Sequence, residues 1–369
     1  MTELPSRWRM PLAGATVCAV LVAIVIVLRE DSVPPPAAPA GTVSDQPMVL
    51  VLRAVDFVHE RHWFGVQGRC QETDARRCAH TLLESEHGQV RSRELPAELR
   101  GQRGGTAVGV TVLGPERLLV QSDPGRRWYS ADRGQHWAEV GPDAPPVGEI
   151  PPNGVLERHC EPLPGCTPKI MVTLPDSGRR AELRGVPPLT EIVLHTGFAD
   201  ADGKWRLVGR RADRPVLAAS ADRGRSWQVG ELPPGPRGQL IDAEVALSGR
   251  STYLRLASRP PERDGKPATA LYRDDGARWQ LVWQSDPAGP EPRSLTGVLP
   301  RPGGQLAATD ERGDGWVSAD GGRSFQPARP EDQIPRGRPR RARTGYLAEA
   351  GNTLSHSPDG VRWTPLPNG

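Results

Sequence analysis

Two histidines lie three residues apart in the segment His59-Glu60-Arg61-His62. Imidazole nitrogens are common zinc ligands, but a zinc site needs about four ligands that converge, and no third ligand can be named near this pair. The flanking residues predict a turn between two strands rather than one face of a helix. We therefore expect a solvated turn here and no bound metal.

The densest basic stretch covers residues 336–343 and reads Arg-Gly-Arg-Pro-Arg-Arg-Ala-Arg. Guanidinium groups bind phosphate, acidic glycans and anionic headgroups, so the stretch is a candidate anion site. The alternative is a loop between two repeats of the chain, and we expect that loop. Asp200-Ala201-Asp202-Gly203 resembles the start of a calcium loop but lacks the closing Glu, so a hairpin turn is expected.

Composition excludes several classes of function. Lys and Arg (47) nearly balance Asp and Glu (44), and the net charge of +3 does not favour a nucleic-acid partner. The sequence has no defensible Ser-His-Asp or phosphate-loop pattern, and no cofactor is expected. With 40 Pro and 41 Gly, the chain has the composition of many short strands joined by turns.

A short motif, Ser-x-Asp-x-Gly-x-x-Trp, recurs along the chain. Close copies begin at Ser130, Ser220 and Ser318, and looser copies begin at Tyr272 and Ser357. The residues that carry the motif are Asp132, Gly134, Trp137, Asp222, Gly224, Trp227, Asp274, Gly276, Trp279, Asp320, Gly322, Phe325, Asp359, Gly360 and Trp363. Asp accepts hydrogen bonds within its own turn, Gly permits positive φ, and the aromatic residue packs where the next strand begins. The motif therefore predicts a hairpin turn.

The spacing of these turns predicts the architecture. Two degenerate copies fill the gaps, with acidic residues Glu86 and Asp176, and successive acidic positions are then 39 to 52 residues apart. A period of about 40–50 residues is typical of propeller blades. We predict an all-β protein, a β-propeller of seven four-stranded blades with each motif turn between the third and fourth strands. Because the third repeat is weak, six blades with an insertion remain the alternative.

The motif resembles the Asp-box, or bacterial neuraminidase (BNR) repeat, of sialidase-like β-propellers, over roughly Val49 to Gly369. The resemblance implies the fold but not the enzyme, because in that family the box is a turn away from the active site. Sialidases need three arginines for the substrate carboxylate, a Tyr nucleophile with a Glu partner, and an Asp acid/base. Here the Arg-Ile-Pro opening motif is absent, and Tyr346 is the only plausible nucleophile. No catalytic residue is assigned.

The N-terminal segment predicts a membrane anchor. Residues 10–28 are uncharged and apolar, long enough to span a bilayer, and follow Arg7 and Arg9. We expect a cytoplasmic tail (1–9), a transmembrane anchor (10–28), a Pro/Ala-rich linker (29–48) and an exported propeller (49–369). A cleaved signal peptide, cut near Ala38-Pro39-Ala40, is the alternative and would give a secreted protein.

Four cysteines form two close pairs in the exported part. Export to an oxidising compartment predicts the disulfides Cys70–Cys78 and Cys160–Cys166, each closing a short loop. Zinc is the competing hypothesis, but there is no Cys-x-x-Cys.

Three functions follow from these expectations. The first is a non-catalytic binding or scaffolding module at the cell envelope, whose partner is an envelope protein, a peptide or a glycan. The second is an exo-glycosidase of the sialidase type, which requires three arginines and Tyr346 to converge in the funnel of the propeller. The third is a purely structural envelope protein, which a plugged or apolar funnel would indicate.

Overall fold

The computed structural model describes residues 48–71, 74–100, 108–122, 125–159, 168–194, 196–260, 267–276, 278–286 and 288–367. All of them lie in a compact unit that spans Gln46–Gly369. The expected tail and anchor, nearly all of the expected linker, and Cys160 and Cys166 lie outside the described residues. No helix among the described residues is long and apolar enough to cross a membrane.

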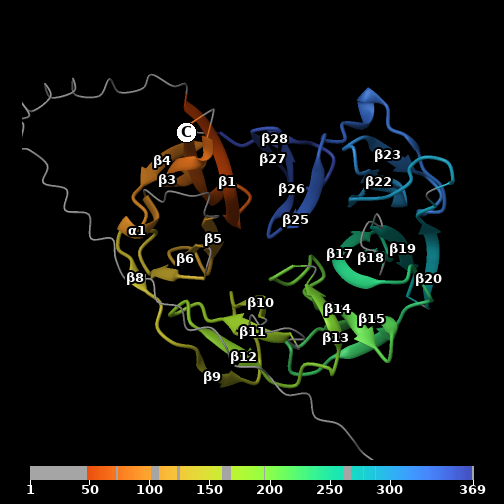
Figure 1. Cartoon of the computed structure of the whole chain (residues 1–369), viewed down its shortest axis with the longest axis horizontal. Helices are drawn as coiled ribbons and strands as arrows, with labels where there is room; N and C mark the ends of the chain where they lie inside the picture. Colours follow the sequence, from red (N-terminus) through yellow and green to blue (C-terminus); the bar gives the residue numbers. More distant parts are fainter. Residues whose placement is uncertain are drawn as a thin grey trace, which may run out of the picture. The chain divides into compact units, whose positions relative to one another are not determined.

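Seven four-stranded sheets make up the unit, and each sheet is one blade of a β-propeller (Figure 1). Blade 1 contains β1 (Met48–His59), β2 (His62–Gln71), β3 (Asp74–Glu86) and β4 (Gln89–Arg93). Blade 2 contains β5 (Val108–Val112), β6 (Leu118–Ser122), β7 (Arg127–Ser130) and β8 (Ala138–Glu139). Blade 3 contains β9 (Ala144–Val147), β10 (Val155–His159), β11 (Lys169–Thr173) and β12 (Arg180–Leu183).

The remaining blades follow in chain order. Blade 4 contains β13 (Thr190–Leu194), β14 (Trp205–Arg211), β15 (Arg214–Ser220) and β16 (Gln228–Glu231). Blade 5 contains β17 (Gln239–Ser248), β18 (Ser251–Arg259), β19 (Ala268–Asp274) and β20 (Trp279–Gln284). Blade 6 contains β21 (Gly297–Pro300), β22 (Leu306–Thr309), β23 (Gly315–Ser318) and β24 (Gln326–Pro327). Blade 7 contains β25 (Arg338–Ala342), β26 (Gly345–Ala350), β27 (Thr353–Ser357) and β28 (Thr364–Pro365).

The helices described in this unit are short: α1 (Ala97–Arg100) and the 3-10 turns η1 (Pro302–Gly304) and η2 (Pro330–Asp332). The innermost strands lie side by side around the ring, with β1 against β5, β13 against β10 and β17, and β21 against β17 and β25. β27 contacts β1, which closes the ring between the last blade and the first. The prediction of seven blades is confirmed, and the six-bladed alternative is wrong.

Blade 3 departs from the predicted order. Its outer strand, β9, precedes the rest of the blade and pairs in parallel with β12, with Ala144 opposite Ala181. The predicted turn at residues 174–178 joins β11 to β12, so it lies between the second and third strands, and its expected position was wrong. β9 supplies the outer strand in place of a segment that follows β12, and its Pro145 and Pro146 are tolerated because the outer side of an edge strand has no partner.

In the turn that begins at Ser220, one hydroxyl joins the two sides of the loop. Ser220 Oγ donates to Asp222 Oδ1 at 2.8 Å and accepts the Gly224 N–H at 2.7 Å. Asp222 Oδ1 also accepts the Ser226 N–H at 2.9 Å. The turns at Ser130 and Ser318 repeat these bonds, and the turn at Ser357 repeats the Ser–Asp and Gly–Ser bonds in a shorter loop. These four loops are called the Ser-x-Asp turns below.

The glycine of a Ser-x-Asp turn has two separate roles. Gly134 has φ +82°, a conformation that L side chains rarely adopt. A Cβ at this position would also lie 2.7 Å from Leu82 of the preceding blade. Gly322 makes the same close approach, 2.7 Å, to Leu271 of the blade before it. The motif therefore shapes each hairpin and also sets how tightly neighbouring blades pack.

The hydrophobic core fills the seams between blades. Phe64 and Leu82 of blade 1 pack with Leu118 and Val120 of blade 2 in one buried cluster. Another cluster joins blades 3 and 4, and a third joins blades 4 and 5. Because every strand has two faces and each face meets a neighbouring blade, the propeller buries apolar side chains on both sides of most sheets.

Candidate functional site

Carboxylates on the innermost strands join one blade to the next. Asp56 Oδ2 accepts the Val112 N–H at 2.8 Å, linking blade 1 to blade 2. Glu191 Oε2 of blade 4 accepts the Leu240 N–H of blade 5 at 3.1 Å. Glu244 Oε2 of blade 5 accepts a backbone N–H of blade 6, that of Val298, also at 3.1 Å. These bonds join the innermost strands of neighbouring blades. Together these strands form the wall in which a site can lie.

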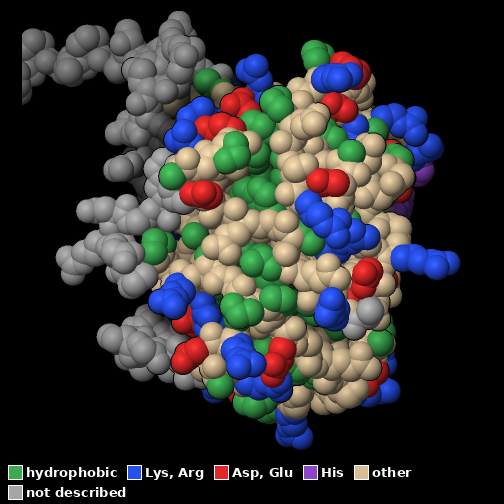
Figure 2. Space-filling view, turned by 90° about the vertical axis from the view of Figure 1, so that its right-hand side faces the viewer, with side chains coloured by type: hydrophobic (Ala, Val, Ile, Leu, Met, Phe, Trp, Pro, Cys, Tyr) green, Lys and Arg blue, Asp and Glu red, His purple; other side chains and the backbone are tan. Residues whose placement is uncertain are grey.

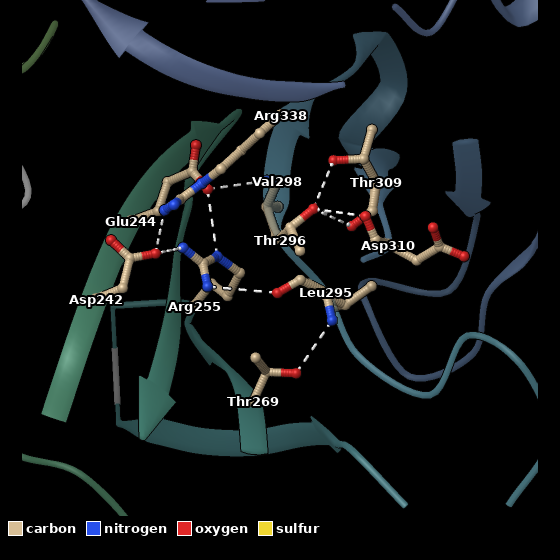
Figure 3. A network of polar contacts seen from close by, with 10 residues as sticks. All are labelled: Asp242, Glu244, Arg255, Thr269, Leu295, Thr296, Val298, Thr309, Asp310 and Arg338. Atoms are coloured by element: carbon tan, nitrogen blue, oxygen red, sulfur yellow. Dashed lines mark hydrogen bonds and ion pairs between the residues drawn. The ribbon is translucent and has the colours of Figure 1, made fainter. Parts of the chain in front are cut away.

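The side chain of Arg255 is buried in this wall and is 1% exposed. It donates to the Asp242 carboxylate, to Glu244 Oε2 at 3.3 Å and to the Leu295 carbonyl at 3.3 Å (Figure 3). Arg338 of β25 donates to the same Asp242 carboxylate. Burial alone would lower the pKa of Arg255, but Glu244 and Asp242 outweigh it and raise that pKa.

A pocket of about 370 Å³ lies between β1, β5, β25 and the loop at residues 196–198. This central pocket, as it is called below, is lined by Arg53 and Asp56 of β1, by Thr111 of β5, and by Arg340 and Arg343. Its walls come from the innermost strands of blades 1, 2, 3 and 7, with Val155 of β10 representing blade 3, together with Leu347 of β26 and a loop of blade 4.

The basic stretch at 336–343 is not the expected inter-repeat loop. It contains β25, the innermost strand of blade 7, which pairs with β26 on one side only. Pro339 is tolerated because an edge strand has no partner for its missing N–H, and its ring packs on Gly297 of blade 6. Pro339 and Ala342 are buried, whereas Arg338 and Arg340 are exposed and Arg341 is half-buried. The arginines thus line the inside of the ring.

Positive charge dominates the central pocket. Its one described carboxylate, Asp56, is paired with Arg343 at 3.2 Å, and Arg343 also donates to the Val112 carbonyl at 2.9 Å. Arg53 and Arg340 are exposed, and neither is paired with a carboxylate in the part of the chain that the structure describes. The pocket therefore offers two open guanidinium groups to an anion.

The loop of blade 4 forms one side of the pocket. Its Gly197 carbonyl accepts the Leu156 N–H of blade 3 at 2.7 Å, and the Phe198 ring lies 5.3 Å beneath the Arg343 guanidinium. The loop then forms the expected hairpin turn, in which the Gly203 N–H donates to the Asp200 carbonyl at 2.8 Å.

The two aspartates of that turn hold a side chain of the protein itself. Arg206, 4% exposed, pairs with Asp200 at 2.5 Å and with Asp202 at 2.6 Å. Burial would lower the pKa of Arg206, but Asp202 and Asp200 raise it. A guanidinium thus occupies the place of the cation that the calcium-like pattern would have bound.

The histidine pair lies at the hairpin between β1 and β2, as expected, but the expectation of a solvated turn is wrong for His62, whose ring is buried against Phe64. His62 is 2% exposed, and its Nε2 is 3.5 Å from Glu84 Oε1, while Glu86 and Arg133 lie close by. Burial lowers the pKa of His62 despite the two carboxylates. No set of three ligands that could hold a metal occurs among the described residues.

Tyr346 does not line the central pocket. It lies on β26, 6% exposed, and packs with Leu299, Ala307 and Trp363 at the seam between blades 6 and 7. Burial raises the pKa of Tyr346 to about 12, which disfavours the phenolate that a nucleophile needs. The convergence that sialidase chemistry requires is not formed by the described residues.

The disulfide Cys70–Cys78 is confirmed, and it joins directly opposed residues of β2 and β3. Cys70 Sγ also lies 3.5 Å from the guanidinium of Arg53, at the edge of the central pocket. The disulfide therefore ties together the strands that support one of the two open arginines. The second predicted pair, Cys160–Cys166, lies outside the described residues.

The outer face shown in Figure 2 differs from the central pocket. Lys and Arg side chains are interspersed there with Asp and Glu, and neither sign forms a continuous patch. Apolar side chains are scattered over the same face in small groups. On this face, therefore, no surface of a single charge competes with the pocket as an anion site.

No family model matches the chain, and no curated protein matches it. Among solved structures, YCF48 bound to D1 peptide is 14% identical with a TM-score of 0.45, covering 84% of this chain and 91% of that one. BamB from Moraxella catarrhalis is 13% identical with a TM-score of 0.39, covering 85% of each chain. Polysaccharide lyase Uly1 is 12% identical with a TM-score of 0.49, covering 88% and 90%. At such identities the likeness concerns the fold alone.

Proposed function

We propose that this protein is a non-catalytic binding module, tethered to the cell membrane, whose exported propeller binds an acidic segment of an envelope protein. The observation that carries the proposal is the charge of the central pocket. Arg53 and Arg340 are open there, whereas Asp56 is already paired with Arg343. Guanidinium groups bind carboxylates strongly through charge-assisted hydrogen bonds.

The lining of the pocket favours a peptide over an acidic glycan. Sugar rings are commonly held by stacking on an exposed aromatic side chain. Phe198 is the aromatic residue in the described lining, and the Arg343 guanidinium already covers its ring. A peptide carboxylate needs only the open donors of Arg53 and Arg340.

Two observations support a location of the propeller outside the cytoplasm, one from the sequence and one from a covalent bond. The uncharged run at residues 10–28, with Arg7 and Arg9 ahead of it, supports an anchor that leaves the propeller outside the cytoplasm. Disulfides persist in oxidising compartments, so Cys70–Cys78 supports the same location. A secreted form after signal cleavage is the competing outcome.

Under this proposal the chain is a non-catalytic member of the Asp-box, or BNR, repeat propellers. The support is the repeated bonding of the Ser-x-Asp turns, in which one serine hydroxyl joins the Asp carboxylate to the Gly N–H. No observation on the described residues favours a catalytic role, since Tyr346 is buried away from the central pocket.

The test is a crosslinking pull-down of the full-length protein from cells, with the anchor alone as the background. Replacing Arg340 by Glu should lower recovery of the partner by at least about tenfold, because a charge-assisted bond is lost and a repulsion is added. Raising the salt concentration should weaken the wild-type interaction in the same direction.

Arg336→Glu is the matched control, because Arg336 is also exposed but lies outside the lining of the central pocket. It changes net charge by the same amount and should leave recovery unchanged. Equal losses in the two variants would overturn the pocket as the binding site. Recovery of an acidic glycan instead of a protein, lost in Arg340→Glu, would change the partner class and keep the site.

A further inference from the structure

Blades 1 and 7 meet without a chain connection between them. Every other pair of neighbouring blades is joined by the chain itself, whereas blade 1 begins with β1 and blade 7 ends with β28. Each of these two blades is built from four consecutive strands, so neither lends a described strand to the other (Figure 1). The disulfide Cys70–Cys78 lies inside blade 1. The contact between blades 1 and 7 is called the closure seam below.

Apolar and aromatic side chains fill the closure seam. Leu52 and Phe57 of blade 1 belong to one buried cluster with Ala342 and Leu354 of blade 7. The Phe57 ring also lies against the His356 ring, with 4.4 Å between their centroids. β27, which carries Leu354 and His356, contacts β1. Because each blade keeps its own four strands, this seam can open without unfolding either sheet.

An ion pair crosses the seam beside these apolar contacts. Asp56 of β1 lies 3.2 Å from Arg343, which follows β25 directly. Arg343 also donates to the Val112 carbonyl of blade 2. The pair neutralises Asp56, the described carboxylate of the central pocket, so that carboxylate is not free to balance other cations there.

The central pocket has walls on both sides of the closure seam. Arg53 lies on its blade 1 side and Arg340 on its blade 7 side. Two like charges that line one pocket repel each other, so an empty pocket opposes closure of the ring. An anionic group that bonds to both guanidiniums replaces this repulsion with attraction.

The backbone of blade 1 fixes the position of Arg53. The pairing of β1 with β2 shifts register between Leu52 and Ala54, so Arg53 is the extra residue of a β-bulge and has no partner on β2. A bulge re-aims the side chain that it carries. The Arg53 side chain lies against Gly68 of β2, and its guanidinium is 3.5 Å from Cys70 Sγ. Arg53 is therefore part of blade 1 and moves with it when the seam opens.

We propose that the bound acidic segment is the clasp of the ring: its carboxylates bond to Arg53 and Arg340 across the closure seam, and opening of the seam releases it. This inference rests on the proposed function and adds how binding at that site is regulated. The two events are linked thermodynamically, so any change that opens the seam weakens binding of the segment.

The test is hydrogen–deuterium exchange of the full-length protein in detergent, measured by mass spectrometry, with end-blocked hexaglutamate as the probe. β27 does not line the central pocket, so slower exchange there reports closure of the seam rather than direct contact with the probe. Probe at ten times its Kd should slow exchange of β27 by about tenfold, because it binds only the closed ring. β15, the corresponding third strand of blade 4, should exchange at its original rate, and hexaglutamine should slow neither strand.

Two leucine variants form a matched pair. Leu354 is buried on the third strand of blade 7 in the closure seam, and Leu217 is buried on the third strand of blade 4 in the cluster that joins blades 4 and 5. Leu354→Ala should weaken probe binding by at least about threefold, because a larger share of the molecules is open. Leu217→Ala should leave probe binding unchanged.

Two arginine variants show whether the effect passes through the pocket. Arg340→Glu should abolish the slowing of exchange at β27, whereas Arg336→Glu, outside the lining, should keep it. Exchange of the wild type needs no substitution, so it decides the question even where a leucine variant does not fold.

The possible failures are distinguishable. Probe binding that depends on Arg340 but leaves exchange of β27 unchanged, or slows β27 and β15 equally, would overturn the clasp and leave the proposed function standing. Equal losses of binding in the two leucine variants would also overturn the clasp alone. Absence of hexaglutamate binding, or binding that does not depend on Arg340, would overturn both.

Discussion

The hydroxyl of Ser220 makes two bonds at once in a site that water does not reach. It donates to Asp222 and accepts the N–H of Gly224, and Ser220 itself is 1% exposed. Asp222, by contrast, is half-buried, and its carboxylate accepts the Ser226 N–H. The buried serine and the half-buried aspartate therefore stabilise the turn in different ways.

Ser220→Ala should reduce the free energy of unfolding by about 1–3 kcal/mol, because the buried Gly224 N–H would lose its acceptor. The measurement is unfolding by urea, followed by tryptophan fluorescence. Ser226→Ala removes another hydroxyl bonded to Asp222, but an exposed one, and should cost no more than about 0.5 kcal/mol. Equal effects of the two substitutions would show that burial does not decide the contribution of the turn.

At the scale of strands, the blades are joined by polar bonds as well as by apolar seams. Glu244 of β17 bonds to β21 and to Arg255 of β18, and Arg255 reaches the carbonyl of Leu295 in the next blade. Such a network is stable only while each member keeps its partners. Removing one charge leaves the others buried and unpaired, which is costly.

Arg255→Met should destabilise the protein by about 3–5 kcal/mol, since it leaves Asp242 and Glu244 without their buried partner. Arg338→Met removes a guanidinium from the same Asp242, but Arg338 is 54% exposed, so the expected cost is below about 1 kcal/mol. Thermal and denaturant unfolding of the two variants would compare them directly. A mild effect of Arg255→Met would mean that water reaches the network and replaces the guanidinium.

Local patterns predicted the strands and turns, because the residues that determine a hairpin turn and its flanking strands are close together in the sequence. The contacts of the candidate site are not local. Glu244 and Val298 are far apart in the sequence, and Asp56 meets Arg343 across the closure of the ring. A basic stretch that contains proline also resembles a loop until its place beside β26 is known. No local pattern identifies β25, because Arg-Pro-Arg-Arg-Ala at residues 338–342 has no alternation of apolar and polar residues.

At the scale of the whole molecule, stability should depend on pH at both ends of the range. Burial raises the pKa of Tyr272 and of Tyr346 from 10.0 to about 12. Above about pH 10 the unfolded chain loses these protons while the folded protein keeps them, so stability falls as pH rises from about 10 to 12.

At the acid end, protonation of the turn aspartates reduces stability as the pH falls below about 4. Hydrogen bonds from Ser226 and Ser220 lower the pKa of Asp222 from 3.8 to about 2. For Asp320, burial would raise the pKa, but the bonds from Ser324 outweigh it and bring the value to about 2. The unfolded chain binds protons first, so stability is lost as pH falls from about 4 to 2.

Between about pH 4 and pH 10, the buried histidines determine how stability depends on pH. Burial lowers the pKa of His62, His80 and His356 below the ordinary 6.5. The unfolded chain therefore binds more protons once the pH falls below about 6.5, and the free energy of unfolding should decrease from pH 7 towards pH 5.

Urea unfolding at a series of pH values measures this slope. His62→Gln should make the slope shallower, whereas the same change at the exposed His87 should leave it as in the wild type. An unchanged slope in His62→Gln would show that water or Glu84 compensates the protonated ring, and that burial of His62 does not make the propeller acid-sensitive.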